Sequence, residues 1–419
     1  MSFNSISHAH ARAGYRCYEG MIWYVSVDGD VKVCVSRLFG TIVARDKACK
    51  IVARVLAPPV DCDPSRGMHV FGGFNPPPRP LPISLPDELD DLSLLRRASL
   101  SSLPNPNPNP TPTLSFSHLG TTNPRPKIAF LFLTNTDLVH APLWNRFFHS
   151  HDPFFNIYVH ADPSAQITPP PGVFQGRFIS AKTTRRASPS LISATRRLLA
   201  TAIIDDPDNA FFALLSQHCV PLHSFDYVYN TLFVVRPTNK HSTSTSRKVK
   251  LKGYGGGEKR YKSFIEILDK EPVLWDRYNA RGKNVMVPEV KFEEFRVGSQ
   301  FFVLTRKHAL MVIKDRKLWR KFKLPCLNKE SCYPEEHYFP TLLSMEDPKG
   351  CTQFTLTRVN WTGSIDGHPH TYSPPEVSPE LIYRLRVSNS SYSYLFARKF
   401  SPDCLDPLME MADTVIFRD

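Results

Sequence analysis

The sequence lacks an uninterrupted apolar run long enough to cross a membrane. The best candidate, residues 21–27, is ended by Asp28 and Asp30, which leaves it well short of the ~20 apolar residues that a spanning helix needs. No apolar segment of the kind found in signal peptides follows the first residues. The sequence therefore predicts neither a membrane anchor nor a signal peptide.

Several motifs of metal and cofactor sites are also missing. None of the nine cysteines forms a Cys-x-x-Cys pair, which disfavours a zinc ribbon or a thioredoxin-like site. No Gly-x-Gly-x-x-Gly or Walker motif occurs, so a dinucleotide-dependent oxidoreductase and a P-loop kinase are disfavoured. The Asp-x-Asp triplets at residues 28–30, 61–63 and 206–208 do not follow apolar strands. Pro207 makes the last triplet typical of a turn that ends a helix, and we predict no metal site.

Acidic residues are too few to balance the basic ones, and the net charge is +13. Such a charge suggests a nucleic acid, an anionic membrane or a phosphate-bearing substrate as partner. The densest basic cluster, at residues 236–262, contains serine, threonine and glycine and is typical of a mobile loop. Because no helix-turn-helix, RNA-recognition or zinc-finger spacing accompanies it, a nucleic-acid partner is the minority interpretation.

Glycosylation sequons and cysteines give a weak indication of compartment. Sequons begin at Asn360 and Asn389, although such tripeptides often arise by chance. They favour a secretory compartment that permits disulfides. An odd number of cysteines leaves at least one thiol unpaired, and the sequence leaves the pairing open. Five cysteines lie in the same C-terminal two-thirds: Cys219, Cys326, Cys332, Cys351 and Cys404.

Proline divides the chain into parts. Residues 76–80 and 104–110 are so rich in proline that they can neither continue a helix nor pair in a central strand. We predict an N-terminal segment of unknown role at residues 1–64, where patches such as 31–35 favour short strands. A proline-rich stem or linker follows at residues 65–125, and a large folded domain at residues 126–419.

Apolar strands alternate with helices in the folded domain. Continuous apolar runs at 127–134, 155–162 and 210–216 are typical of strands buried on both faces of a parallel sheet. The alternation predicts an α/β fold with an open sheet. In such sheets ligands bind at the carboxyl ends of strands, where Asp162 and Ser216 fall. Further strands are predicted at 178–180, 300–304 and 354–360, and helices at 143–148, 189–204, 225–232 and 306–313.

A helix is predicted to begin at the sequence Pro334-Glu335-Glu336-His337-Tyr338, because proline and acidic residues are favoured in the first turn. Pro340 predicts a kink or an interruption. Taken alone, the two acids favour a solvated helix start, and a catalytic base is the alternative. Because adjacent residues diverge around a helix, the two acids are not the facing carboxylates of a glycosidase.

Several stretches of the folded domain together form an ordered set of motifs: residues 127–134, 156–162, 214–222, 297–302, 334–338, 359–361 and 396–400. In order and spacing this set resembles one family, the Core-2/I-branching β-1,6-N-acetylglucosaminyltransferases and their plant relatives. The resemblance covers about residues 126–419, and it is specific because the motifs occur in order at similar spacing. The sequence departs from the family at Phe295 and Phe302, where many relatives carry tryptophan.

The resemblance implies a GT-A-like fold and an inverting, metal-independent transfer from a UDP-sugar to a glycan hydroxyl. It implies that Glu336 is the base, that Asp162 lies on the uridine side, and that Lys399 meets the leaving diphosphate. No cofactor or metal is expected. Fixed cations would then neutralise the departing UDP. Other residues predicted to bind substrate are Ser216, Gly298, Ser299, Gln300, Arg306, Trp361 and Arg398.

The family's usual N-terminal anchor is not visible in residues 1–64, so membrane association in the Golgi is expected from the resemblance alone. A non-catalytic relative that binds a carbohydrate or another partner is the alternative function, since a fold does not guarantee an activity. The sequence names neither the sugar nor the acceptor. It leaves N-acetylglucosamine, xylose and glucuronic acid open as donor sugars.

Overall fold

The computed structural model describes residues 25–26, 52–53, 87–101, 125–233, 261–364 and 368–419. The chain divides into two units, Met1–Pro82 and Ile83–Asp419. In the first unit, β1 (Val25–Ser26) and β2 (Val52–Ala53) form an antiparallel pair. The strand expected near residues 31–35 lies outside the described residues.

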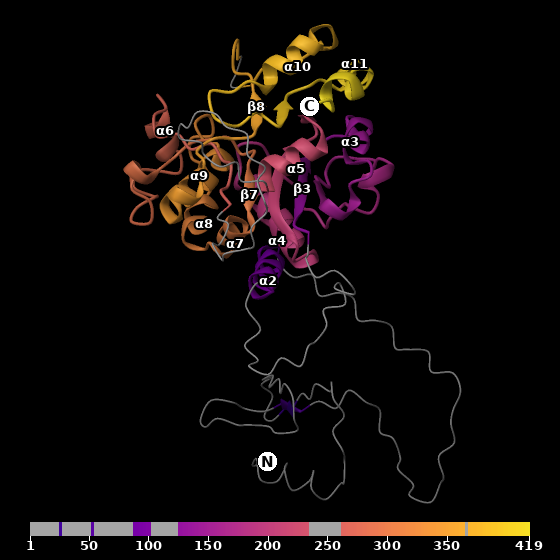
Figure 1. The fold of residues 1–419 in the computed structure, drawn as a ribbon. Helices are drawn as coiled ribbons and strands as arrows, with labels where there is room; N and C mark the ends of the chain where they lie inside the picture. The colour runs from indigo at the N-terminus through magenta and orange to yellow at the C-terminus, as the bar shows by residue number, and fades with distance from the viewer. Residues whose placement is uncertain (1–24, 27–51, 54–86, 102–124, 234–260, 365–367) are drawn as a thin grey trace, which may run out of the picture. The chain divides into compact units, whose positions relative to one another are not determined.

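A four-stranded sheet forms the centre of the second unit. Its order is β4 (Phe155–Ala161), β3 (Lys127–Thr134), β5 (Asn209–Ser216) and β7 (Val303–Thr305). The first three strands are parallel, and β7 pairs with β5 antiparallel. This confirms an α/β fold with an open, mixed sheet flanked by helices (Figure 1). The long apolar runs of the sequence became the three central strands because both of their faces are covered.

Alternate residues of β3 enter two different cores, as the two-residue period of a strand requires. Ala129 and Leu131 lie in a core with α4 (Pro189–Asp205), α7 (Arg306–Lys314), α8 (Lys317–Phe322) and α9 (Pro334–Glu346). Phe130 and Phe132 lie in a second core with α3 (Ala141–Phe148) and α5 (Phe225–Phe233). The buried sheet thus fixes helices on both of its faces.

A smaller sheet carries the C-terminal part of the chain. Its order is β6 (Val220–Pro221), β9 (Phe396–Arg398) and β8 (Thr357–Val359). Helix α10 (Pro379–Arg386) lies between β8 and β9 in the sequence, and α11 (Leu405–Glu410) follows β9. A third core contains residues of both helices and of this sheet. The short helix α6 (Leu274–Tyr278) precedes the central helix α9 in the chain. Other short turns of 3-10 or π-helix are Asp152–Phe154, Gly172–Phe174, Phe292–Glu294, Pro348–Gly350, Pro374–Glu376, Pro402–Cys404 and Ala412–Ile416.

One helix corrects the prediction that residues 65–125 are only a linker. Helix α2 (Asp87–Leu100) lies in that range and packs on α4 and α7 (Figure 1). Ala98 is fully buried in the core. Asp91 forms ion pairs with Arg197, and with Lys182 at 3.6 Å. The folded unit therefore begins before residue 126, because α2 buries apolar surface in the core. Sequence analysis missed this helix because the residues on both sides of it are rich in proline.

No helix in the described residues is long and apolar enough to span a membrane.

Candidate active site

The first turn of α9 is enclosed by the protein. Pro334 is the first residue of the helix, as the sequence predicts, and the helix continues through Pro340 to Glu346. Glu335 is only 5% exposed, and the side chain of Glu336 is 31% exposed. The alternative of a solvated helix start is therefore wrong. Most of the remaining residues of this helix are also buried. Tertiary packing therefore stabilises the helix despite the internal proline.

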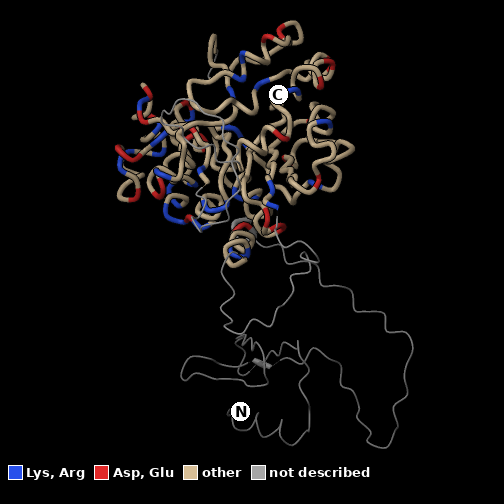
Figure 2. Tube along the Cα trace, in the orientation of Figure 1, with Lys and Arg blue, Asp and Glu red and all other residues tan. Residues whose placement is uncertain are grey.

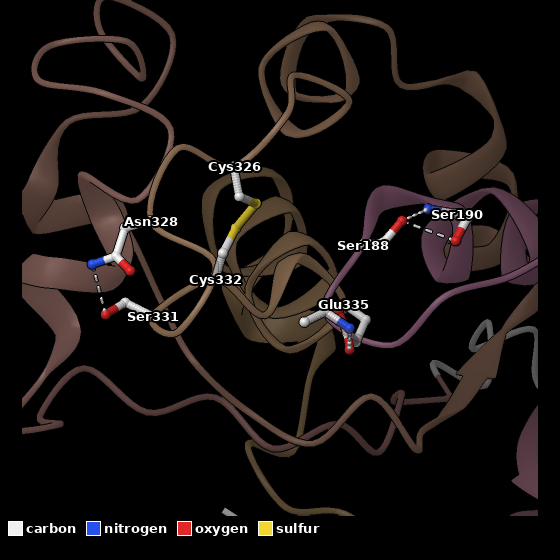
Figure 3. Close-up of a disulfide and its surroundings, with 8 residues drawn as sticks. Ser188, Ser190, Cys326, Asn328, Ser331, Cys332 and Glu335 are labelled. Carbon is white, nitrogen blue, oxygen red and sulfur yellow. Dashed lines mark hydrogen bonds between the residues drawn. A yellow bond between two sulfur atoms is a disulfide. The ribbon is translucent and has the colours of Figure 1, made fainter.

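A disulfide holds the segment just before α9. Cys326 and Cys332 are bonded, with their Cα atoms 6.1 Å apart. Figure 3 shows this bond beside α9, near Glu335. The bond closes a short loop at the helix start, which restricts the unfolded chain and the position of Tyr333. Cys219, Cys351 and Cys404 are buried free thiols.

Glu336 lies among basic side chains. Its Oε2 accepts a hydrogen bond from Arg277 Nη1 at 2.9 Å. Burial raises the pKa of Glu336 above its ordinary value, although the charges of Arg277, Arg186 and Arg398 oppose the rise. The carboxylate is thus partly removed from water while cations stabilise its ionised form. Oε1 stays available to accept a proton, which a general base requires.

The Gly298 motif contacts the backbone at Glu336. Gly298 N–H donates to Glu336 O at 2.9 Å, and Ser299 N–H donates to Glu266 Oε2 at 3.0 Å. A Cβ atom at position 298 would lie only 2.0 Å from Glu266 O. Only glycine permits this approach of three backbone segments. The motif therefore positions the helix start, and Gln300 is half-buried beside it.

His337 has a structural role beside Glu336. It is 1% exposed, stacks on Phe295 with ring centroids 4.6 Å apart, and its Nδ1 donates to Arg296 O at 2.8 Å. Burial lowers the pKa of His337 to about 3, so the ring is neutral. Phe295 and Phe302 are both buried in the core, so neither can stack on a sugar.

Two cations at the end of β9 lie near the site. The Arg398 guanidinium lies 4.2 Å from the Phe301 ring centroid. Burial lowers the pKa of Lys399, and the charges of Arg398 and Arg186 lower it further. The positive charges of Arg186, Arg398 and Lys399 therefore repel one another. The negative charge of Glu336 favours the charged form of Arg398.

Sequence analysis missed two residues of this cluster, Arg186 and Arg277. Their guanidinium groups lie 5.9 Å and 5.1 Å from the centroid of the Tyr333 ring. Arg186 belongs to the turn before α4, and Arg277 to α6. Neither stands in a recognisable motif, because each reaches Glu336 only through long-range packing.

Asp162 follows β4, as predicted, but both of its carboxylate oxygens accept hydrogen bonds from other residues of the protein. Its Oδ1 accepts hydrogen bonds from the N–H and hydroxyl of Ser164, at 2.8 and 2.6 Å. Its Oδ2 accepts the same pair from Thr184, at 2.8 and 2.6 Å. Burial raises the pKa of Asp162, but the hydrogen bonds outweigh this and hold it at about 2. Asp162 joins two loops, and a contact with uridine stays a prediction.

Ser216 and Trp361 each precede or follow a segment that pairs with residues next to Lys399. The turn after Ser216 places His218 O against Phe400 N–H at 3.2 Å. Trp361 follows β8, in which Val359 pairs with Arg398 of β9. Its side chain is 54% exposed, so it is available for stacking on a sugar. Both residues stay predictions as ligands.

Arg306 lies apart from this cluster, and its role as a substrate-binding residue stays a prediction. Its guanidinium donates to Ile203 O, Asp206 O and Asn209 O at 3.1 to 3.2 Å. These carbonyls lie at the end of α4 and the beginning of β5, at the opposite end of that strand from Ser216. Arg306 thus links the end of α4 to the beginning of β5.

A pocket in the described residues lies away from this cluster. It has a volume of about 580 Å³ between α2, α4 and α8, and its lining includes His160, Lys182 and Trp319. None of the cations around Glu336 lines it. The charged cluster at Glu336, rather than this pocket, has the groups that acid–base chemistry requires. The described residues include no group of three or more side chains arranged to hold a metal ion.

Comparison with known proteins shows the family of the chain. The family model of the Core-2/I-branching enzymes matches residues 128–255 and 251–386. The chain belongs to this family. Its α/β fold, with an open mixed sheet, is consistent with the GT-A-like architecture that the resemblance implies. Glu336, Gly298 and Arg277 all lie within the matched region.

A rice protein gives an independent comparison. The chain is 28% identical over 326 residues to "Glycosyltransferase BC10" of Oryza sativa subsp. japonica, covering 66% of this chain and 74% of the rice protein. The family and this relative together make the chain a glycosyltransferase. A glycosyltransferase binds a sugar donor and a glycan acceptor, and the cluster at Glu336 is the candidate place for both.

Gly298→Ala tests the role of the glycine motif. The added methyl group would meet the Glu266 backbone, so we expect the free energy of unfolding to fall by about 1–3 kcal/mol. Glu336 would also shift with its backbone partner. Thermal unfolding by circular dichroism measures the loss, with Ser299→Ala as the matched control. An unchanged melting temperature for Gly298→Ala would contradict the close approach.

Proposed function

We propose that this protein is an inverting, metal-independent glycosyltransferase that moves a sugar from a UDP-sugar to a hydroxyl group of a glycan. The observation that carries the proposal is the set of basic side chains around one carboxylate, Glu336. Arg277 contacts this carboxylate directly, and Arg186 and Arg398 act on it electrostatically. Family membership supplies the reaction class, and the charges favour a donor with a diphosphate.

The mutual repulsion of the cations supports an anionic ligand. Arg186, Arg398 and Lys399 each disfavour the charge of another member of the group. Such a cluster is costly without a compensating anion, because burial weakens the screening by water. A diphosphate would relieve the repulsion. As the bond to the sugar breaks, charge develops on the diphosphate, and fixed cations would stabilise it in the transition state.

Glu336 is suited to receive the acceptor's proton. In the proposed step, an acceptor hydroxyl attacks the anomeric carbon while its proton passes to Glu336. The bond from that carbon to the diphosphate breaks, and UDP leaves with the bonding electrons. Attack opposite to the leaving group inverts the configuration. Since Arg277 binds Oε2 at 2.9 Å, the proton would go to Oε1.

The transferred sugar and the compartment belong to the proposal as well. The family resemblance favours N-acetylglucosamine, and the exposed Trp361 offers a ring face for a sugar. The sequon at Asn389 is exposed, and Cys326 is bonded to Cys332. Both features are typical of the secretory pathway, so we propose a Golgi location.

One contact favours the alternative of a non-catalytic binding protein. The ion pair between Arg277 and Glu336 occupies one oxygen of the proposed base, and it stabilises the form that binds no proton. A relative that only binds carbohydrate could retain this pair. UDP binding without turnover of any donor sugar would identify that function.

Glu336→Gln tests the base. The amide keeps the size of the side chain but cannot accept the proton, so we expect turnover to fall by ~100-fold or more. UDP affinity and the melting temperature should change little. Steady-state transfer assays with a UDP-sugar measure the effect. Glu335→Gln is the matched control, and equal losses in both variants would make the assignment of Glu336 untenable.

Lys399→Ala tests the leaving-group cations. Losing a cation that acts on the transition state should cost roughly 2–4 kcal/mol, or ~30- to 1000-fold in turnover. UDP affinity should fall as well, while thermal stability should stay close to that of the wild type. Lys399→Arg should retain part of the activity. Lys307→Ala is the control, because that lysine is 70% exposed and pairs with Asp347. Wild-type kinetics for Lys399→Ala would refute the role.

A further inference from the structure

A second carboxyl group lies buried next to the proposed base. Glu335 is 5% exposed, and its Oε1 accepts a hydrogen bond from Ala187 N–H at 3.3 Å. Its Oε2 is buried and has no hydrogen-bond partner among the described residues. Figure 3 shows Glu335 at the start of α9, directed toward the turn that contains Ser188. The reaction proposed above gives this acid no part.

The turn that Glu335 contacts presents Arg186 to the site. Ala187 has a φ of +54°, a conformation that alanine rarely adopts without surrounding support. On one side of it Ser188 caps α4 by accepting from Ser190 N–H at 3.2 Å. On the other side Thr184 is held by Asp162. The bond from Ala187 to Glu335 joins this turn to α9, as does the contact of Arg186 with the Tyr333 ring.

We propose that Glu335 is a positioning residue that joins the Arg186 turn to the start of α9. The same helix end would then place both the base Glu336 and a cation beside it. In this arrangement Glu335 touches neither substrate nor the reacting atoms. It acts through the backbone at Ala187. This inference rests on the proposed function for its effect on catalysis, but the structural coupling can be measured without any activity.

The charges that face Glu335 explain why it can stay neutral beside an ionised base. Burial raises the pKa of Glu335 to about 7, and the neighbouring Glu336 raises it too, whereas Ala187 N–H and Arg186 lower it. Arg281, which is 4% exposed, also interacts with the charge of Glu335. A proton on Glu335 removes the repulsion between adjacent carboxylates. Glu336 can then carry the negative charge.

Hydrogen exchange tests the coupling directly. We compare wild type, Glu335→Ala and Glu335→Gln in the full chain by mass spectrometry of peptides covering residues 183–190. Glu335→Ala removes the acceptor of Ala187 N–H, so exchange there should become ~10-fold faster or more. Glu335→Gln retains a carbonyl oxygen and should stay near wild type. Residues 209–216 of β5 should be unaffected in both. Unchanged exchange at residues 183–190 in Glu335→Ala would overturn the proposal.

Thermal unfolding at two pH values keeps the proposal testable if Glu335→Ala fails to fold. Because the folded protein holds the Glu335 proton more tightly than the unfolded chain, the contribution of Glu335 to wild-type stability should fall as pH rises from about 5 to about 8. Glu335→Gln removes this group. Its melting temperature should therefore rise relative to wild type over the same range. An equal pH dependence in both proteins would show that Glu335 is not the buried, proton-holding group proposed here.

A double-mutant cycle on UDP affinity links the coupling to the site. If Glu335 acts through Arg186, then Glu335→Ala should weaken UDP binding in the wild-type background and add little in Arg186→Ala. In the Lys399→Ala background its effect should be undiminished. Additive effects in both backgrounds would refute the route through Arg186. Absence of UDP binding by the wild type would instead refute the proposed function, and hydrogen exchange would still decide the coupling.

Discussion

The site depends on one backbone contact, the hydrogen bond from Gly298 N–H to Glu336 O at 2.9 Å. It joins the first turn of α9 to the segment that leads into β7 (Figure 1). A side chain at position 298 would collide with Glu266 O, so glycine is a geometric requirement. Because the central sheet fixes β7, this contact also fixes the position of the base. The disulfide at Cys332 restrains the same helix start from its other side.

Electrostatics then separates the roles of the two adjacent acids. Glu335 is enclosed and tends to hold its proton, while Glu336 lies among arginines that favour its ionised form. Different surroundings thus act differently on neighbouring carboxyl groups, because burial raises the pKa of both while Arg277 opposes the rise at Glu336. Basic residues are distributed over the whole domain (Figure 2). Near Glu336, Arg186 is exposed, whereas Arg277, Arg398 and Lys399 are partly buried. Partial burial makes the charge of Arg398 and Lys399 felt more strongly by an anionic ligand than an exposed charge would be.

Local sequence patterns predicted the parts of the fold that their own residues determine. The apolar run at residues 127–134 became β3 with the predicted bounds, because continuous burial leaves a clear pattern. The helix start at Pro334 was predicted for the same kind of reason. Helix α2 was missed because proline-rich flanks conceal it. Arg186 and Arg277 were missed, because packing determines which residues far apart in sequence become partners. The sequence around an aspartate such as Asp162 does not show whether its carboxylate binds a ligand or a neighbouring loop.

The stereochemistry of transfer tests the central claim most directly. The full chain is incubated with UDP-N-acetylglucosamine, UDP-xylose and UDP-glucuronic acid in the presence of EDTA, with and without glycan acceptors. Proton NMR then follows the anomeric signals. The account predicts that a donor is consumed despite the chelator, and that the product has the anomeric configuration opposite to that of the donor. Retention of configuration, or turnover that appears only when Mn²⁺ is restored, would contradict it.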